Sequence, residues 1–301
     1  MNKKLAIGAA VHDDFDGIYW SIQSIRINNL DLLDQLEFII IDNNPNSEHG
    51  KQTKNLASRI NCKYVPYTDV KSTAIRNQVF ENSEADFTMC IDSHVLFEPG
   101  TIKKLLQFIE NNSDSKDLYH GPMLYDHFQN GPTSVCSHMA PVWRANMFGI
   151  WDHNHKAHNP EGEPYEIPMH GMGIFMCKTD AWLGFNKNFR SFGGEEGYIH
   201  KKFRKAGRKI YNLPFLRWNH RFQRPNGISY PIVLADRIRN YLIGHTELGQ
   251  NYDDIFEHFG FGPWGGITHI DLLEEVDQMN IPIFEPEKPF VPLKNISGEK
   301  V

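Results

Sequence analysis

Residues 5–91 alternate between short apolar runs and stretches whose apolar residues recur at helical spacing. The apolar runs are typical of strands buried on both faces, because they continue without the polar alternation of a half-exposed strand. Such alternation of strand and helix predicts an α/β fold, in which a mostly parallel, Rossmann-like central sheet is flanked by helices. The predicted strands are residues 5–11, 37–41, 62–66 and 87–91, and the predicted helices include residues 51–60 and 72–80.

Polar residues directly follow three of these strands. His12 follows the first strand, Asp42 the second and Asp92 the fourth. Ligands of such sheets bind beyond the carboxyl ends of the strands, so these three side chains mark a candidate binding edge. Asp42, with Asn43 and Asn44 after it, also fits a plain turn, and that alternative stays open.

The fourth strand runs into the triplet Asp92-Ser93-His94. Side chains two residues apart in an extended segment point the same way, so Asp92 and His94 can bind one metal ion. Mn²⁺ accepts both carboxylate oxygen and imidazole nitrogen. An isolated pair of this kind equally fits a helix-capping aspartate and a surface histidine. Two later features favour the metal site, namely the glycine-rich acidic segment 191–196 and His220.

Composition restricts the class of protein. A chain of 301 residues with 40% hydrophobic content can bury one large core or two modest ones. A net charge of -6 and a pI near 6.2 do not indicate the overall basic character of proteins that bind nucleic acid or an anionic membrane. The cysteines are far apart and include no C-x-x-C pair, which argues against a disulfide framework and a cysteine zinc site. Without an apolar signal segment or a long apolar run, the sequence predicts a soluble, cytoplasmic protein.

The pattern is less regular beyond residue 100, because Gly-Pro and similar pairs interrupt any periodicity. The proline-rich tail beyond residue 260 is expected to run over the surface. The sequence predicts a helix capped by Thr101, loops and short strands over 121–168, a buried strand over 170–177, and a helix over 199–206 that Gly207 ends.

These features together resemble the metal-dependent nucleotide-sugar glycosyltransferases of the GT-A fold, over residues 3–224. The first two strands are similar to those of family-2-type enzymes, and residues 72–77 resemble the Ala-Arg-Asn stretch of the family. Asp92-Ser93-His94 stands where most members carry Asp-x-Asp. Together with Gly193-Gly194-Glu195 and the later His220, this Asp-x-His version looks most like the polypeptide N-acetylgalactosaminyltransferases.

The resemblance implies a hexosyltransferase that moves a sugar from a UDP-sugar donor to an acceptor hydroxyl. Mn²⁺, or Mg²⁺, would hold the leaving diphosphate. Asp42 would meet the base, and Arg76 would approach the phosphates. The implied metal ligands are Asp92, His94 and His220, and the implied donor-binding residues are Val11, Asp42, Arg76, Asp92, Ser93, Gly173 and Gly194.

The acidic pair Glu195-Glu196 leaves the stereochemical outcome open. In inverting relatives the second acid of this segment supplies the base, which here is Glu196, whereas in the retaining N-acetylgalactosaminyl enzymes the glutamate holds the sugar. Catalytic roles are therefore assigned to Glu196 and Glu195 without a choice between the two outcomes. Both residues also fit plain first-turn acids that complement a helix dipole.

Residues 1–224 are predicted to form the GT-A domain, with donor binding in about 1–100 and acceptor binding and catalysis in about 101–224. Residues 225–301 are predicted to be a helical or irregular extension on the acceptor side, within the same compact unit. The acceptor is an unidentified carbohydrate, protein or other hydroxyl compound. Two other functions stay open, a nucleotide-sugar or glycan-binding protein without catalysis and a nucleotidyltransferase. The sequence does not indicate an oligomeric state.

Other motifs have weaker interpretations. His153, His155 and His158 could chelate zinc, although an acceptor-facing loop is the favoured interpretation. Four aromatic residues could stack on a sugar acceptor or simply belong to the core. These are Trp143, Trp151, Phe261 and Trp264.

Overall fold

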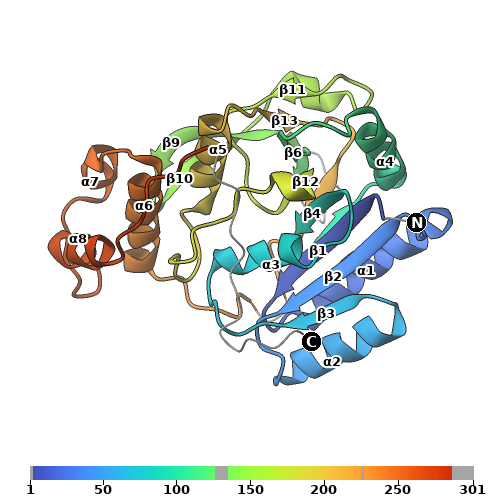
Figure 1. The fold of residues 1–301 in the computed structure, drawn as a ribbon, viewed down its shortest axis with the longest axis horizontal. Helices are drawn as coiled ribbons and strands as arrows, with labels where there is room; N and C mark the ends of the chain where they lie inside the picture. Colours follow the sequence, from blue (N-terminus) through green and yellow to red (C-terminus); the bar gives the residue numbers. More distant parts are fainter. Residues whose placement is uncertain (1–2, 126–134, 225–226, 287–301) are drawn as a thin grey trace.

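The computed structural model describes residues 3–125, 135–224 and 227–286, and an eight-stranded sheet forms its centre (Figure 1). The outer four strands on one side are parallel, and β12 interrupts this direction by pairing antiparallel with both of its neighbours. The order across the sheet is β11 (Tyr165–Glu166), β13 (Ile210–Asn212), β6 (Leu118–His120), β12 (Ile174–Lys178), β4 (Phe87–Ile91), β1 (Leu5–Val11), β2 (Leu36–Asp42) and β3 (Lys63–Pro66).

The sheet is covered on both faces, because alternate residues of each strand point to opposite sides. Leu5 and Ile7 of β1 belong to one apolar core, whereas Ala6 belongs to the other. The first core is completed by α1 (Phe15–Asn28), α2 (Glu48–Arg59) and α4 (Thr101–Asn111). The second core is completed by α3 (Asn77–Glu81), α5 (Glu195–Lys205), α6 (Leu234–Leu248), α7 (Asp253–Phe259) and α8 (His269–Gln278).

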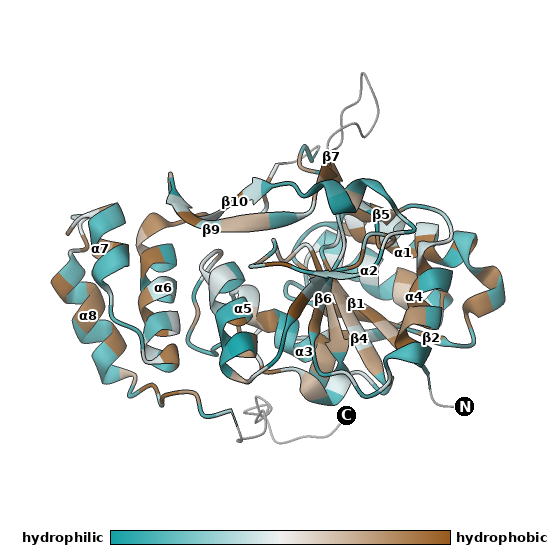
Figure 2. Cartoon of the chain, turned by 90° about the horizontal axis from the view of Figure 1, so that it is seen from above, coloured by the Kyte–Doolittle hydropathy of each residue, from teal (hydrophilic) through white to brown (hydrophobic). Residues whose placement is uncertain are grey.

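Hydropathy follows this layering. In Figure 2 the strands at the centre of the sheet are coloured as hydrophobic, while teal residues lie on the helices around them. The predicted α/β fold with a mostly parallel sheet and flanking helices is therefore confirmed. The antiparallel direction of β12 was not predictable from residues 170–177, because an apolar run does not encode the direction of a strand.

Two smaller sheets complete the fold, and four of their strands lie within residues 121–168, where short strands were predicted. A four-stranded sheet has the order β5 (Val95–Phe97), β14 (Trp218–His220), β7 (Met123–Tyr125) and β8 (Val135–Cys136). A separate hairpin pairs β9 (His138–Arg144) with β10 (Met147–Asp152). Single 3₁₀ turns lie at Leu30–Leu32, Thr73–Arg76, His155–His158 and Thr179–Ala181.

Several predicted boundaries were wrong. The helix predicted over 72–80 is a 3₁₀ turn followed by α3, with Ser72 as the capping residue. Thr101 does not cap α4, because Gly100 occupies the cap position with a φ of 82° and no side-chain cap bond. The helix predicted over 199–206 begins earlier, at Glu195.

The segment after residue 230 forms helices that pack on the rest of the molecule. Helices α6, α7 and α8 lie together at one end of the molecule, beside α5 (Figure 1). The part of the tail between residues 260 and 286 contains α8, which begins with a capping box between Thr268 and Asp271. Pro289 and Pro292 of the predicted tail lie outside the described residues.

The remaining expectations concern thiols and membranes. The four cysteines are buried and free. No helix within residues 3–125, 135–224 and 227–286 combines the length and the apolar character needed to cross a bilayer.

Candidate functional site

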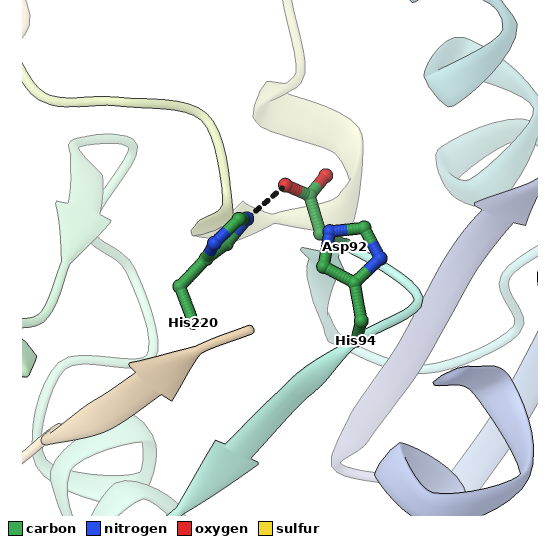
Figure 3. Close-up of side chains that lie close together, drawn as sticks. All are labelled: Asp92, His94 and His220. Atoms are coloured by element: carbon green, nitrogen blue, oxygen red, sulfur yellow. Dashed lines mark ion pairs between the residues drawn. The ribbon is translucent and has the colours of Figure 1, made fainter. Parts of the chain in front are cut away.

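Asp92, His94 and His220 come together where the central sheet meets the four-stranded sheet (Figure 3). Asp92 directly follows β4, and His94 directly precedes β5. His220 ends β14, which runs antiparallel to β5 and places His220 opposite Val95. One possible ligand atom from each residue lies within 4.8 Å of the others. Two segments far apart in the sequence thus build one cluster of a carboxylate and two imidazoles.

The distances within this cluster suit a shared cation. Asp92 Oδ2 lies 3.4 Å from His220 Nε2, and the rings of His94 and His220 are edge to face, with centroids 4.8 Å apart. His94 Nε2 and His220 Nδ1 are buried and have no hydrogen-bond partner among the described residues. Buried polar atoms normally have a partner, so Nε2 of His94 is available to an ion shared with Asp92 Oδ2 and His220 Nε2. A donor set of one carboxylate and two imidazoles fits Mn²⁺ and other divalent transition metals.

Charge on the carboxylate is secured by its neighbours. Burial acts to raise the pKa of Asp92. Two neighbours outweigh this effect and hold that pKa well below its usual range, namely the guanidinium of Arg76 and the contact with His220. Arg76 Nη2 lies 3.0 Å from Asp92 Oδ1. Arg76 Nη1 lies 3.5 Å from Glu195 Oε1. Arg76 is 9% exposed, so its side chain is largely shielded from water. Arg76 therefore links the metal-site candidate to the acidic pair.

The acidic pair occupies the first turn of α5. Gly193 and Gly194 precede it with φ angles of 102° and 92°, a left-handed conformation that glycine adopts without strain. Asn240 of α6 fixes this turn, because its Nδ2 donates to the carbonyl of Gly193 at 2.8 Å. Glycine at 194 also permits close packing, since an added Cβ there would lie 2.9 Å from Asn240 Cβ.

Both glutamates of the pair are poorly solvated. Glu195 is fully buried, and its two carboxylate oxygens make no hydrogen bond within the described chain. Burial raises the pKa of Glu195, and the charge of Glu196 raises it further, while Arg76 opposes both effects. Burial also raises the pKa of Glu196, which retains 9% exposure. A plain role as first-turn acids does not explain this burial, because such acids normally remain in water.

The other predicted donor-binding residues lie at the same edge of the sheet. Val11 and Asp42 are paired in register at the ends of β1 and β2. Asp42 holds the turn after β2, because its carboxylate accepts from the backbone N–H of Asn44 at 2.9 Å and from the hydroxyl of Tyr64 at 2.7 Å. The turn role of Asp42 is therefore observed, and its contact with a base stays a prediction.

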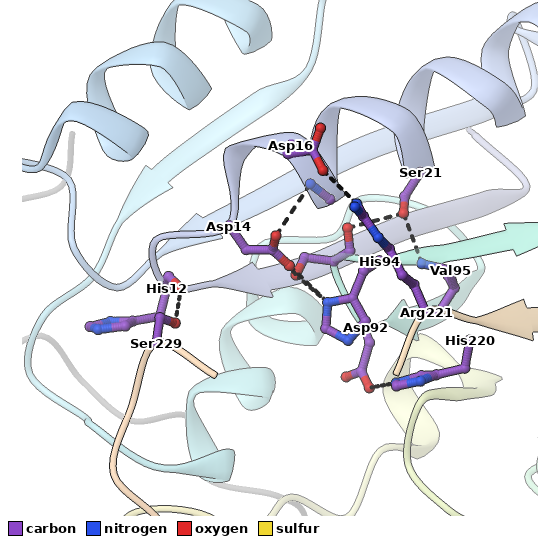
Figure 4. A network of polar contacts seen from close by, with 12 residues as sticks. His12, Asp14, Asp16, Ser21, Asp92, His94, Val95, His220, Arg221 and Ser229 are labelled. Carbon is purple, nitrogen blue, oxygen red and sulfur yellow. Dashed lines mark hydrogen bonds and ion pairs between the residues drawn. The ribbon is translucent and has the colours of Figure 1, made fainter. Parts of the chain in front are cut away.

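Ser93 and Gly173 contact the cluster directly. The carbonyl of Gly173 accepts the backbone N–H of Asp92 at 2.8 Å. Ser93 Oγ donates to Asp14 Oδ2 at 2.6 Å. Asp14 Oδ2 also lies 2.8 Å from His94 Nδ1 (Figure 4). Sequence reasoning missed Asp14. Its available signal was an acid immediately before a helical segment, and Asp14 does cap α1.

A stack of three buried histidines was also missed. His120 of β6 stacks on His170 and His200, with ring centroids 4.8 and 5.0 Å away. His200 Nε2 lies 3.0 Å from His120 Nε2, and His200 Nδ1 contacts the carbonyl of Glu196. All three rings are inaccessible to solvent. Because His200 belongs to α5, the stack packs this helix against His120 of β6 and against His170. The three histidines lie in separate segments and gave no sequence signal for the stack.

The remaining motifs do not join this site. The ring centroids of His153 and His158 lie 6.3 Å apart. Among the described residues, the group whose ligand atoms lie close enough to share a metal ion is Asp92, His94 and His220, and the histidine loop is not part of it. Trp143 has a core role, since it packs against Phe148 and Tyr241. An acceptor-facing role for the histidine loop stays a prediction.

Comparison with solved structures identifies the fold. A crystal structure of GalNAc-T7 with UDP, GalNAc and Mn²⁺ aligns with a TM-score of 0.68 and 14% identity, over 94% of this chain and 55% of that chain. The chain has the GT-A glycosyltransferase fold. Staphylococcus aureus TarS 1-349 aligns with a TM-score of 0.53 and 13% identity, over 93% of this chain and 81% of that one. TarS 1-349 in complex with UDP gives a TM-score of 0.51 and 13% identity, over 80% of this chain and 65% of that one.

Sequence comparison adds one family. Residues 19–120 of this GT-A chain match the model of glycosyl transferase family 2. That match covers much of the parallel half of the sheet and includes Asp92 and His94. Comparison with curated protein sequences gives no match. The chain spans about 55% of the length of the GalNAc-T7 chain.

Proposed function

We propose that this protein is a hexosyltransferase that moves a sugar from a UDP-sugar to an acceptor hydroxyl, with Mn²⁺ bound by Asp92, His94 and His220. The observation that carries the proposal is the convergence of these three side chains at the carboxyl end of β4, with unpartnered imidazole nitrogens among them. The GT-A fold, and a neighbour whose structure contains UDP and Mn²⁺, support the same conclusion.

The chemistry needs negative charge on the leaving diphosphate to be compensated. A divalent ion supplies that compensation when it is bound, at the moment the glycosidic bond breaks. Asp92 is held in its ionised form by Arg76 and is therefore ready to bind a cation. Arg76 itself presents a buried guanidinium whose Nη1 lacks a hydrogen bond within the described chain, a group suited to a phosphate oxygen.

The acceptor hydroxyl must lose a proton in a direct displacement, and a carboxylate with a raised pKa is the stronger base. Glu196 suits this role better than Glu195, because Glu195 faces Arg76 and is fully buried while Glu196 keeps some exposure. Glu195 would then position Arg76. If the product retains the anomeric configuration of the donor, Glu196 would orient the sugar instead. Proton NMR of the product anomer decides between these two roles.

The proposal also assigns a role to each part of the chain. Residues 1–100 would bind the donor, and residues 101–224 would contribute catalysis and part of the acceptor side. Residues 225–301 would complete the acceptor side, since α6 fixes the glycine turn before Glu195 through Asn240. The acceptor would be a carbohydrate, protein or other compound with a free hydroxyl.

The test is the release of nucleoside diphosphate from UDP-, GDP- and dTDP-sugars, each with Mn²⁺ and with EDTA. We expect UDP release that requires Mn²⁺. Asp92→Asn and His220→Ala should each lower it at least about 100-fold, the usual scale for losing one stabilising group in a transition state. The assay contains no acceptor, so His153→Ala, whose side chain is 68% exposed, is the matched control and should retain UDP release.

Three results would contradict the proposal. Full activity of both Asp92→Asn and His220→Ala would eliminate the metal assignment. Tight UDP-sugar binding without turnover, even with a broad set of acceptors, would instead indicate a binding protein. Release of pyrophosphate would indicate a nucleotidyltransferase.

A further inference from the structure

The metal-site candidate has an outer layer that fixes one of its histidines. Asp14 Oδ2 lies 2.8 Å from His94 Nδ1 and accepts a hydrogen bond from Ser93 Oγ at 2.6 Å (Figure 4). The side chains of His94 and Asp14 are only 7% and 16% exposed, so water competes weakly for this contact. The same carboxylate oxygen accepts from Ser93 and faces His94 Nδ1. A carboxylate oxygen accepts hydrogen bonds, so this geometry places the imidazole proton on Nδ1 of His94.

An acceptor at Nδ1 determines the tautomer of a neutral imidazole. With the proton on Nδ1, the other nitrogen of His94 carries the lone pair. That nitrogen, Nε2, is the buried atom that lacks a partner among the described residues. The contact with Asp14 thus leaves Nε2 of His94 in the form that a metal ion requires.

Helix α1 holds the metal-binding segment at two points. Asp14 is the N-cap of this helix, and its Oδ1 accepts the backbone N–H of Gly17 at 3.2 Å. Further along α1, Ser21 Oγ donates to the carbonyl of Ser93 at 3.0 Å and accepts the N–H of Val95 at 2.9 Å. The carboxylate of Asp14 is therefore fixed by the first turn of a helix, and the backbone on both sides of His94 is fixed by the same helix.

We propose that Asp14 is a positioning residue that keeps His94 in the Nδ1–H tautomer and aims its Nε2 at the ion. The inference rests on the proposed metal site and adds a residue that contacts neither ion nor substrate. Asp14→Asn is the informative substitution, because asparagine caps a helix as well as aspartate does. With its oxygen on the helix N–H, the amide would present an N–H to His94 Nδ1 and favour the opposite tautomer.

The experiment measures Mn²⁺ binding to the purified protein by electron paramagnetic resonance, without donor or acceptor. We expect Asp14→Asn to bind Mn²⁺ about 10- to 100-fold more weakly than the wild type, the usual effect of losing an outer partner of a metal-bound histidine. Asp16→Asn is the matched control. It removes the same charge from the same helix end, where Asp16 pairs with Arg221 at the surface, and should bind Mn²⁺ as the wild type does.

A second measurement needs no variant of Asp14. Nitrogen-15 histidine spectra of the metal-free wild type, with His94 assigned from His94→Gln, should show the proton on Nδ1. A proton on Nε2, or wild-type affinity in a folded Asp14→Asn, would overturn the inference. In that case a large loss of Mn²⁺ affinity in His94→Gln would leave the proposed function standing. A wild type that binds no Mn²⁺ would overturn both.

Discussion

Gly173 shows how a single missing side chain sets the spacing of the site. An added Cβ at this position would lie 2.4 Å from the ring of Trp218 and 3.5 Å from Asp92 Oδ2. Trp218 is buried, donates from Nε1 to the carbonyl of Gly121 at 2.8 Å, and begins the strand that ends in His220. The glycine therefore allows the end of β4 and the strand carrying His220 to approach each other. This is a packing role, separate from the donor contact predicted from the sequence.

Gly173→Ala should accordingly disturb both stability and metal binding. We expect the free energy of unfolding to fall by about 1–3 kcal/mol, as for other overpacked interiors, and Mn²⁺ affinity to fall with it, because Trp218 must move. Urea denaturation and Mn²⁺ titration measure the two effects. Gly207→Ala is the control, since Gly207 has a φ of 73° and open space around its Cβ position. It should lose about 1 kcal/mol through backbone strain alone and keep its Mn²⁺ affinity.

At the level of elements, the sequence was most informative where burial is uniform. Strands β1 and β4 begin and end where predicted, because both faces are buried and the apolar runs have sharp polar ends. The prediction of one continuous helix over 72–80 was wrong, because the backbone changes from 3₁₀ to α at Asn77. At that point Asn77 Oδ1 accepts hydrogen bonds from Trp182 and Phe185, which lie far along the chain. The proximity of Asp92 and His94 was predictable from their spacing. The contacts of Asp14 and of the histidine stack were not, because they join residues 30 to 80 positions apart.

The histidine stack makes stability depend on pH. Burial lowers the pKa of His170 to about 4 and that of His200 to about 3, from an ordinary value of 6.5. The unfolded chain therefore takes up protons between pH 6.5 and 4 that the folded chain does not. Stability is fully present above pH 6.5 and should be lost as the pH falls, by up to about 1.4 kcal/mol per pH unit for each histidine. Nearby His138 and Arg204 add to this effect, since both disfavour a further positive charge.

Denaturant midpoints from pH 7.5 to 4.5 measure this dependence. His170→Gln should flatten the slope below pH 6.5, whatever its effect on absolute stability. His153→Gln replaces a histidine whose side chain is 68% exposed and should leave the slope unchanged. An equal slope in the wild type and in His170→Gln would show that the stack does not carry the pH dependence.

For the whole molecule, α5 joins the sheet to the C-terminal helices. Lys202 on its inner side is 4% exposed and pairs with Glu247 of α6, with Nζ and Oε1 2.6 Å apart. Lys202 also donates to the carbonyl of Gly184 at 2.9 Å, and Tyr198 donates to Glu247 at 2.7 Å. A buried pair with all of these bonds is stable only when both partners are present. The helix that carries Glu195 and Glu196 is thereby tied to the segment proposed to face the acceptor.

Breaking this pair should be more damaging than replacing it. Lys202→Met leaves Glu247 buried without its cation and should reduce the free energy of unfolding by about 3–5 kcal/mol. Adding Glu247→Leu should restore part of that loss, as urea denaturation would show. Lys104→Met, which removes an exposed ion pair with Glu161, should change stability by less than about 0.5 kcal/mol. A double variant as unstable as the sum of its single variants would contradict a coupled network.

The register that sets His220 opposite Val95 has a consequence for synthesis of the protein. Asp92 and His94 leave the ribosome early, yet the third proposed ligand, His220, arrives only with the strand Trp218–His220, after all strands of the large sheet have been translated. If these residues bind Mn²⁺ as proposed, a nascent chain halted before that strand would hold an incomplete metal site. Tight binding of Mn²⁺ would then begin only when the late strand docks, so Mn²⁺ binding would report the completion of folding.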